Sequence, residues 1–146
     1  MNNIHILLVE DNEGDIVLTL EAFEEAKIIN DISIVRNGQA AIDFLLQKGE
    51  YANVKTPDLI LMDINLPRKN GLEVLQYIKS DSNLKHIPVV MLTTSSSEKD
   101  ILTSYRNYAS CFISKPVDVH DFLAVISEVE NFWVNIVKLP LRAKSK

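Results

Sequence analysis

The chain alternates short, uninterrupted apolar runs with longer segments in which apolar residues recur every three or four positions. An uninterrupted apolar run of this length is typical of a strand that is buried on both faces of a sheet. Five such runs occur: HILLV (5–9), DISIV (31–35), LILM (59–62), VVMLT (89–93) and CFI (111–113). We predict a strand at each run. DISIV alternates polar and apolar residues, which favours a place at the edge of the sheet.

The segments between these runs have the spacing of amphipathic helices. Apolar residues recur at that spacing in five segments: Ile16 to Phe23, Ala41 to Leu45, Leu72 to Ile78, Ile101 to Tyr105 and Phe122 to Val129. The turn residues RNGQ (36–39), PRKNG (67–71) and HIP (86–88) mark connections between elements. Because strands and helices alternate five times, we predict an α/β domain with a doubly wound parallel sheet, covered by helices on both faces.

Composition and charge narrow the class of protein. The 146 residues, 47% of them hydrophobic and 24% charged, fit one globular domain. A formal net charge of −5 argues against nucleic acid or an anionic membrane as a partner. The single cysteine, Cys111, excludes a disulfide framework. No stretch has the features of a signal peptide or the length of a membrane span, so we expect a cytoplasmic protein.

Polar residues gather where the predicted strands end. Glu10 and Asp11 follow the first strand, Asp63 the third, Thr93 ends the fourth, and Lys115 follows the fifth. In a doubly wound sheet these ends meet at one edge, which is where ligands bind. A solvated acidic rim with Lys115 as an ordinary ion-pair partner is the alternative. The coincidence of such residues at four strand ends favours a ligand site.

The three carboxylates predict a site for a divalent cation. Carboxylates placed close together repel one another and raise one another's pKa values, which a cation would relieve. Mg²⁺ prefers oxygen ligands and commonly uses one or two carboxylates together with a phosphate. We therefore expect Asp11 and Asp63 to be direct ligands and Glu10 to act through water. Lys115 would approach the same site from the other side.

These motifs together resemble the receiver domain of bacterial two-component response regulators. The resemblance extends from His5 to about Phe132, and four motifs carry it: ED (10–11), LMDINLPRKNG (61–71), LTTSS (92–96) and SKP (114–116). It implies a flavodoxin-like (βα)5 fold with a five-stranded parallel sheet in the order 2-1-3-4-5. It also implies a protein that accepts a phosphoryl group from a phosphohistidine of a sensor histidine kinase and changes conformation in response.

The same resemblance assigns roles to individual residues. It makes Asp63 the phosphoacceptor and gives Mg²⁺ the ligands Glu10, Asp11, Asp63 and the backbone carbonyl of Asn65. It makes Thr93 the switch hydroxyl, Lys115 the phosphate-binding lysine and Phe112 the switch aromatic, with a cis bond between Lys115 and Pro116. In the family, the positions of Asn65 and Ser95 tune hydrolysis. Ser95 is too short to orient a water easily, so we expect a moderately long-lived phosphoryl group.

Two other classes of protein share part of this fold or chemistry. An aspartate-nucleophile phosphatase of the haloacid dehalogenase type needs a second acid two residues after the nucleophile, and Asn65 stands there. A flavodoxin-like cofactor binder needs a phosphate cradle after the first strand, and VEDNEGDI (9–16) is acidic instead. Neither class fits these residues.

A finer resemblance within the receiver family and the composition of the C-terminal residues lead to two further expectations. Segments such as PDLILMDINLP (57–67) and IPVV (87–90) are similar to stand-alone regulators that pair with cyanobacterial phytochrome kinases. We expect a single receiver domain over residues 1–146, with 133–146 as a C-terminal extension. Apolar residues crowd its start: Phe132, Trp133, Val134, Ile136 and Val137. We predict that they form the interface of a homodimer, and the alternative is that they fold back on their own domain.

Overall fold

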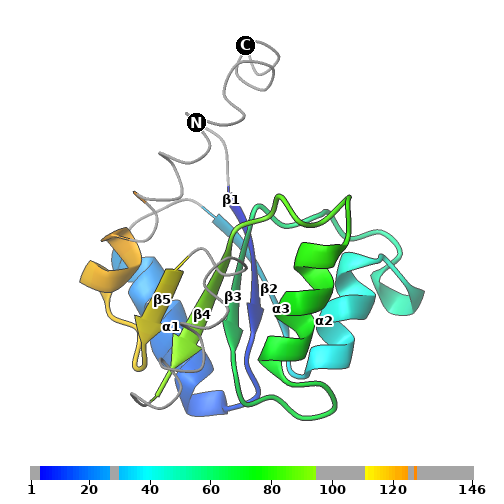
Figure 1. Cartoon of the computed structure of the whole chain (residues 1–146). Helices are drawn as coiled ribbons and strands as arrows, with labels where there is room; N and C mark the ends of the chain where they lie inside the picture. Colours follow the sequence, from blue (N-terminus) through cyan, green and yellow to red (C-terminus); the bar gives the residue numbers. More distant parts are fainter. Residues whose placement is uncertain (1–3, 27–29, 95–110, 125–126, 128–146) are drawn as a thin grey trace, which may run out of the picture.

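All five predicted strands form, and they make one parallel sheet. The computed structural model describes residues 4–26, 30–94, 111–124 and 127. The strands are β1 (Ile4–Val9), β2 (Asn30–Val35), β3 (Leu59–Asp63), β4 (Val89–Thr93) and β5 (Cys111–Ser114). Their order is β2-β1-β3-β4-β5 (Figure 1), as the resemblance implied. The predicted edge position of DISIV is also confirmed, since β2 lies at one edge of the sheet.

The helices follow the strands as the spacing predicted. They are α1 (Glu13–Ala26), α2 (Gly38–Leu45) and α3 (Gly71–Ser80), with a short 3₁₀ helix η1 (Gly49–Tyr51) after α2. Residues 119–124 are helical as well. The helix predicted around Ile101 to Tyr105 lies outside the described residues. None of the described helices is long and apolar enough to cross a membrane.

Asparagine side chains begin two of these helices. The side chain of Asn37 accepts a hydrogen bond from the Ala40 backbone N–H at the start of α2. Asn70 and Glu73 form a reciprocal capping box at the start of α3. Such caps accept hydrogen bonds from backbone N–H groups of the first helical turn, which have no partner within the helix. Both capping residues lie within turn motifs that the sequence marks, so α2 and α3 begin at fixed places beside the strand ends.

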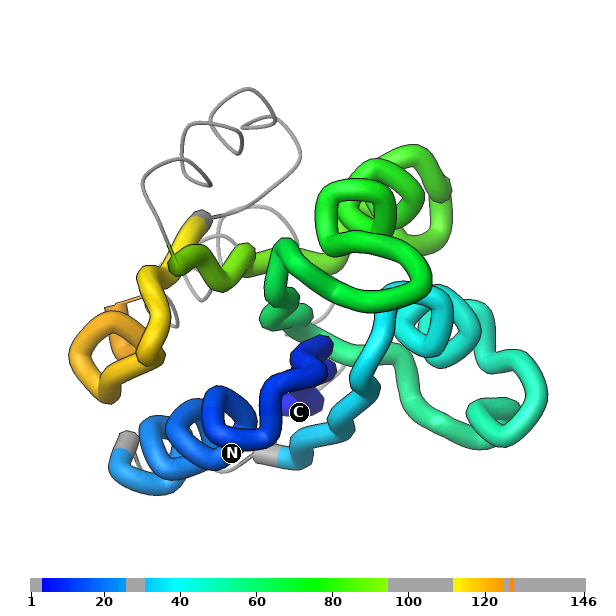
Figure 2. The backbone as a smooth tube through the Cα atoms, turned by 90° about the horizontal axis from the view of Figure 1, so that it is seen from below, coloured from blue at the N-terminus to red at the C-terminus, as the bar shows by residue number. Residues whose placement is uncertain are grey.

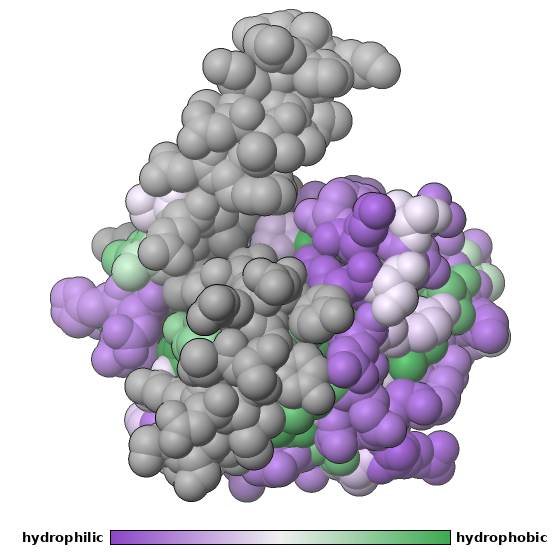
Figure 3. Space-filling view, in the orientation of Figure 1, coloured by the Kyte–Doolittle hydropathy of each residue, from purple (hydrophilic) through white to green (hydrophobic). Residues whose placement is uncertain are grey.

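Alternate strand residues pack against helices on opposite faces of the sheet. On one face, strand residues such as Leu7 and Met62 pack with α2 and α3. On the other, strand residues such as Leu8 and Leu61 pack with α1 and with Phe122 from the helical residues 119–124. Figure 2 shows α1 and residues 119–124 on one side of the sheet and α2 and α3 on the other. The described surface over α2 and α3 is mostly hydrophilic in Figure 3, as expected for the outer side of a covering layer.

The register of the strands brings their carboxyl ends level. Val9 pairs with Met62, so the residue after β1 lies beside the end of β3. Asp63 pairs with Leu92, and Thr93 pairs with Ser114. The backbone N–H of Lys115 then donates to the carbonyl of Thr93 at 2.7 Å. The polar residues that end four different strands therefore reach one edge of the sheet.

Glycine at position 71 lets α3 begin directly against this edge. A Cβ at Gly71 would lie 2.2 Å from the carbonyl oxygen of Asp63 and 2.9 Å from the Cα of Ile64. The Gly71 N–H also donates to the Ile64 carbonyl at 2.7 Å, which closes the loop after β3. Because both obstacles are backbone atoms, any larger residue would displace the segment that carries Asp63.

Candidate functional site

Three carboxylates meet at the carboxyl edge of the sheet. Asp63 is the last residue of β3 and is buried, and Glu10, directly after β1, has no exposed surface. Asp11 beside it is exposed. One carboxylate oxygen from each lies within 4.8 Å of the others. The sequence prediction that these three acids converge is therefore confirmed.

The ammonium group of Lys115 lies among carboxylates at the same edge. Its Nζ is 3.1 Å from Glu10 Oε1, 2.9 Å from Asp15 Oδ2 and 3.4 Å from Asp63 Oδ1. Only 8% of the Lys115 side chain is exposed. The predicted approach of Lys115 to the acidic site is observed, and Asp15 is a partner that the sequence analysis did not identify.

Burial and like charge both act on the acids. Burial raises the pKa of Glu10, and the charge of Asp63 raises this pKa further, while hydrogen bonding and charge from Lys115 partly oppose the rise. Burial works against the charge of Lys115, but hydrogen bonds to Asp15 and Glu10 and the charges of Asp63 and Glu10 outweigh it and raise the Lys115 pKa. The ammonium thus stays charged, yet it balances only part of the acidic charge.

The donor set suits a divalent metal ion. Carboxylate oxygens are the ligands that hard divalent cations prefer. Both oxygens of Glu10 already have partners: Oε1 contacts Lys115 and Oε2 accepts from the Asn12 backbone N–H at 3.2 Å. The exposed Asp11 is therefore the most accessible of the three acids, whereas the buried Glu10 already contacts Lys115 and Asn12.

A buried hydroxyl faces this edge from β4. Thr93 is fully buried at the end of that strand. Its Oγ1 has no hydrogen-bond partner among the described residues. Because an unsatisfied buried hydroxyl costs about 1–3 kcal/mol, this position favours a ligand that can accept its hydrogen.

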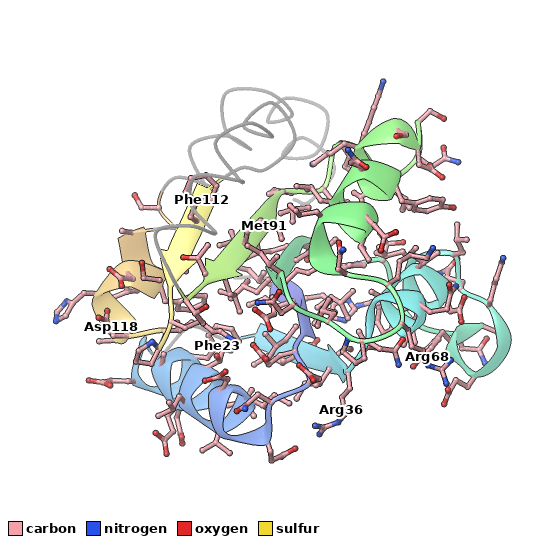
Figure 4. All side chains as sticks on the ribbon, turned by 60° about the horizontal axis from the view of Figure 1, so that its bottom comes forward. Phe23, Arg36, Arg68, Met91, Phe112 and Asp118 are labelled. Atoms are coloured by element: carbon pink, nitrogen blue, oxygen red, sulfur yellow. The ribbon has the colours of Figure 1, made fainter. Side chains whose placement is uncertain are left out.

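Phe112 lies one strand further, on β5. It is half-buried and packs against the core cluster on the α2 and α3 face. Its register partner is Met91 on β4, and Figure 4 shows the two residues on these neighbouring strands. The Lys115–Pro116 bond that follows β5 is cis. Asn65 lies two residues beyond Asp63 and is exposed.

Several predicted residues lie outside the described part of the chain. They are Ser95 and the proposed interface residues Phe132, Trp133, Val134, Ile136 and Val137. Asp15 is the described residue that sequence reasoning missed. Its signal was its place four residues after Asp11, in the first turn of the helix that follows the acidic pair. That first turn begins at the same edge of the sheet as the strand-end acids.

The fold and the site define a phospho-accepting signalling protein. Residues 6–127 match the response regulator receiver domain family. This match covers most of the chain, so the chain belongs to that family. Receiver domains accept phosphoryl groups from histidine kinases, and the alternative of a haloacid dehalogenase-type phosphatase is not supported.

The chain is also similar to individual regulators of this family. It is 44% identical to the response regulator Rcp1 of Synechocystis sp. over 135 residues, which cover 92% of each chain. The structure matches that of the bacteriophytochrome response regulator AtBRR with a TM-score of 0.83 at 41% identity, covering 91% of this chain and 96% of that one.

Two cyanobacterial structures bear on the chemistry. The Mn²⁺-bound form of Rcp1 matches with a TM-score of 0.72 at 43% identity, over 91% of this chain and 96% of that one. The phosphorylated cyanobacterial phytochrome response regulator RcpA matches with a TM-score of 0.74 at 45% identity, over 91% and 95%.

Removal of single acids should separate direct from indirect metal binding. Asp11→Ala should weaken the affinity for Mg²⁺ or Mn²⁺ strongly, because it removes an accessible oxygen ligand. Glu10→Ala should weaken it less, because both Glu10 oxygens already have other partners. Calorimetric titration of the two variants and the wild type measures the difference. Wild-type affinity in Asp11→Ala would contradict the site.

Proposed function

We propose that this chain is a single-domain response regulator in which Asp63 receives a phosphoryl group from a sensor histidine kinase. The observation that carries the proposal is the position of Asp63. It ends a buried strand, lies 3.4 Å from the Lys115 ammonium, and shares its edge with Glu10 and Asp11. A carboxylate so placed is held by the sheet, and its neighbours supply both the positive charge and the metal ligands that phosphoryl transfer requires.

The reaction moves one phosphoryl group between two side chains. An Asp63 carboxylate oxygen attacks the phosphorus, the bond from phosphorus to the kinase histidine nitrogen breaks, and the imidazole leaves with its electron pair. The product is an acyl phosphate, which water later cleaves to carboxylate and inorganic phosphate. Lys115 offsets negative charge on the phosphoryl oxygens during transfer. We include in the proposal that the chain catalyses both its own phosphorylation and its own dephosphorylation.

Mg²⁺ is the proposed cation. Asp11 and Asp63 would hold it, Glu10 would act through water, and the Asn65 backbone carbonyl would complete the protein ligands. When bound, it supplies positive charge next to the phosphoryl oxygens. The Mn²⁺-bound structure of the relative Rcp1 supports a divalent metal at such a site.

The proposed output is a change of conformation at β4 and β5. The Thr93 hydroxyl would donate to a phosphoryl oxygen on Asp63 and draw its loop inward. Phe112, half-buried on the neighbouring strand, would then change rotamer. Phosphorylation would bias an equilibrium between two arrangements of this face rather than build a new one.

The proposed kinase partner is a phytochrome. Structural neighbours named as phytochrome or bacteriophytochrome response regulators support this choice, and the similarity covers 91% of the chain. The proposal includes a single domain over residues 1–146, with 133–146 as an extension, in the cytoplasm.

We further propose a homodimer through Phe132, Trp133, Val134, Ile136 and Val137, because apolar residues at successive positions cannot all face one core.

Asp63→Asn should abolish phosphoryl acceptance while the domain stays folded, since the amide keeps the shape but is not a nucleophile. The full chain is incubated with a phosphorylated phytochrome kinase, or with acetyl phosphate and Mg²⁺, and its mass is measured. Asp43→Asn on α2 is the matched control and should gain the phosphoryl increment like the wild type.

A full phosphoryl increment on Asp63→Asn would refute the assignment of the acceptor. The same assay across a panel of purified sensor kinases tests the partner. Faster transfer from unrelated kinases than from phytochromes would refute the phytochrome pairing but leave Asp63 in place.

Thr93→Val should affect the two states in opposite directions. In the unphosphorylated domain it removes a buried hydroxyl that has no partner among the described residues, so the free energy of unfolding should rise by about 1 kcal/mol. In the phosphorylated domain it removes the proposed donor, so the phosphoryl-induced stabilisation should shrink. Urea unfolding with and without the phosphoryl mimic beryllofluoride measures both. Equal effects in the two states would contradict a switch role.

Truncation of the tail should abolish self-association. Light scattering compares the full chain with a chain that ends at Val129, each with and without beryllofluoride. We expect the full chain to approach the mass of two copies and the truncated chain to remain a single copy. A full chain that stays monomeric at high micromolar concentration in both states would exclude the homodimer.

A further inference from the structure

Asp15 makes the shortest contact with the ammonium of Lys115. The distance from Nζ to Asp15 Oδ2 is 2.9 Å, against 3.1 Å to Glu10 and 3.4 Å to Asp63. Charge-assisted N–H···O bonds of about 2.7–2.9 Å are the strong ones. Of these three carboxylates, Asp15 is thus the principal anchor of the lysine, although it belongs to a helix and not to a strand end.

Asp15 itself is held in place on both sides of its backbone. Its N–H donates to Asn12 Oδ1 at 2.9 Å, and its carbonyl accepts from the buried Thr19 hydroxyl at 2.8 Å. The carboxylate that contacts Lys115 therefore projects from a fixed point in the first turn of α1. A long, flexible lysine loses rotamer freedom when it is held there, so the anchor defines where its ammonium lies.

One N–H group of the Lys115 ammonium is left for an acceptor on the side of Asp63. An ammonium has three N–H groups. Two are directed to Asp15 and Glu10, which form hydrogen bonds with Nζ. The third is left for the side of Asp63, whose contact is the longest of the three. A phosphoryl oxygen attached to Asp63 would bring an acceptor to that third donor without displacing either of the other two.

We propose that Asp15 is a positioning residue that aims Lys115 at the phosphoryl group on Asp63. The proposal rests on the proposed function of Asp63. Asp15 is not among the described acids whose oxygens lie together as a metal cluster, which are Glu10, Asp11 and Asp63. Its effect on the reaction therefore passes through Lys115.

A purely structural role would give a different result. In that case, the pair of Asp15 and Lys115 only fastens α1 to the segment after β5. Removing Asp15 would then lower the stability of the domain and leave the rate of phosphorylation unchanged. Phosphorylation rates of Asp15 variants, measured in chains with Lys115 and in chains where Lys115 is substituted, distinguish the two roles.

The test is a double-mutant cycle in the full chain, with acetyl phosphate and Mg²⁺. A small-molecule donor avoids any effect of α1 on kinase docking. Asp15→Asn should slow phosphorylation about fivefold to tenfold, the effect expected for loss of one charged hydrogen bond. In a Lys115→Met background, Asp15→Asn should change the rate by less than about twofold. Asp15→Glu should restore part of the rate.

Glu13→Gln is the matched control from the same helical turn. Glu13 pairs with Arg36 at 2.7 Å, and both side chains are exposed. Its removal takes one negative charge from α1 without touching Lys115, so the rate should match the wild type. Thermal unfolding of every variant confirms that it is folded, and calorimetry should give Asp15→Asn a Mg²⁺ affinity within about threefold of the wild type.

Three results would refute the positioning role of Asp15 without affecting the proposed function of Asp63. They are a wild-type phosphorylation rate in Asp15→Asn, an equal slowing of phosphorylation with and without Lys115, or a loss of rate in proportion to a loss of Mg²⁺ affinity. If Asp15→Asn does not fold, Asp15→Glu and its combination with Lys115→Met form the same cycle. A folded wild type that takes up no phosphoryl group would refute the proposed function and the role of Asp15 with it. That outcome is distinct from the other three.

Discussion

The buried ammonium of Lys115 is the group on which this edge of the sheet depends. Four acids lie around it or next to it, and three of them contact it directly. Glu10 is fully buried and Asp63 nearly so, which makes their mutual repulsion expensive. A buried ion pair gains little net stability, but the loss of one partner leaves an uncompensated buried charge. Stability alone therefore does not explain why Lys115 and these acids lie together, which favours a functional role for the group.

This arrangement exists because parallel strands end level with one another. Glu10 and Asp11 directly follow β1, Asp63 ends β3, the hydroxyl lies on β4 and the amine lies in the segment after β5. No two of these elements are adjacent in the sequence, and the hydrogen bond from the Lys115 N–H to the Thr93 carbonyl sets the last of them in register. The loop after β3 is closed against Gly71, so the backbone of Asp63 is restrained from a second side.

The fold and most of the site could be predicted from the sequence for the same reason. Continuous apolar runs identify buried strands, and the residues that follow them must share one edge. Asp15 could not be found in this way. Its helix follows the acidic pair, but whether its side chain reaches Lys115 depends on the phase of α1 and on the path of the chain after β5. Neither of these follows from hydrophobic spacing.

Phosphorylation and cation binding should support each other at this site. The unphosphorylated domain carries two costs at one edge: an excess of acidic charge around Lys115, and a buried Thr93 hydroxyl that lacks a partner among the described residues. In the proposed switch, a phosphoryl group on Asp63 would supply an acceptor for the hydroxyl but would add negative charge. A divalent cation offsets that charge but gives the hydroxyl nothing. Each removes the cost that the other leaves. Phosphorylation should therefore raise the affinity for the cation, and the cation should favour the phosphorylation equilibrium by the same factor.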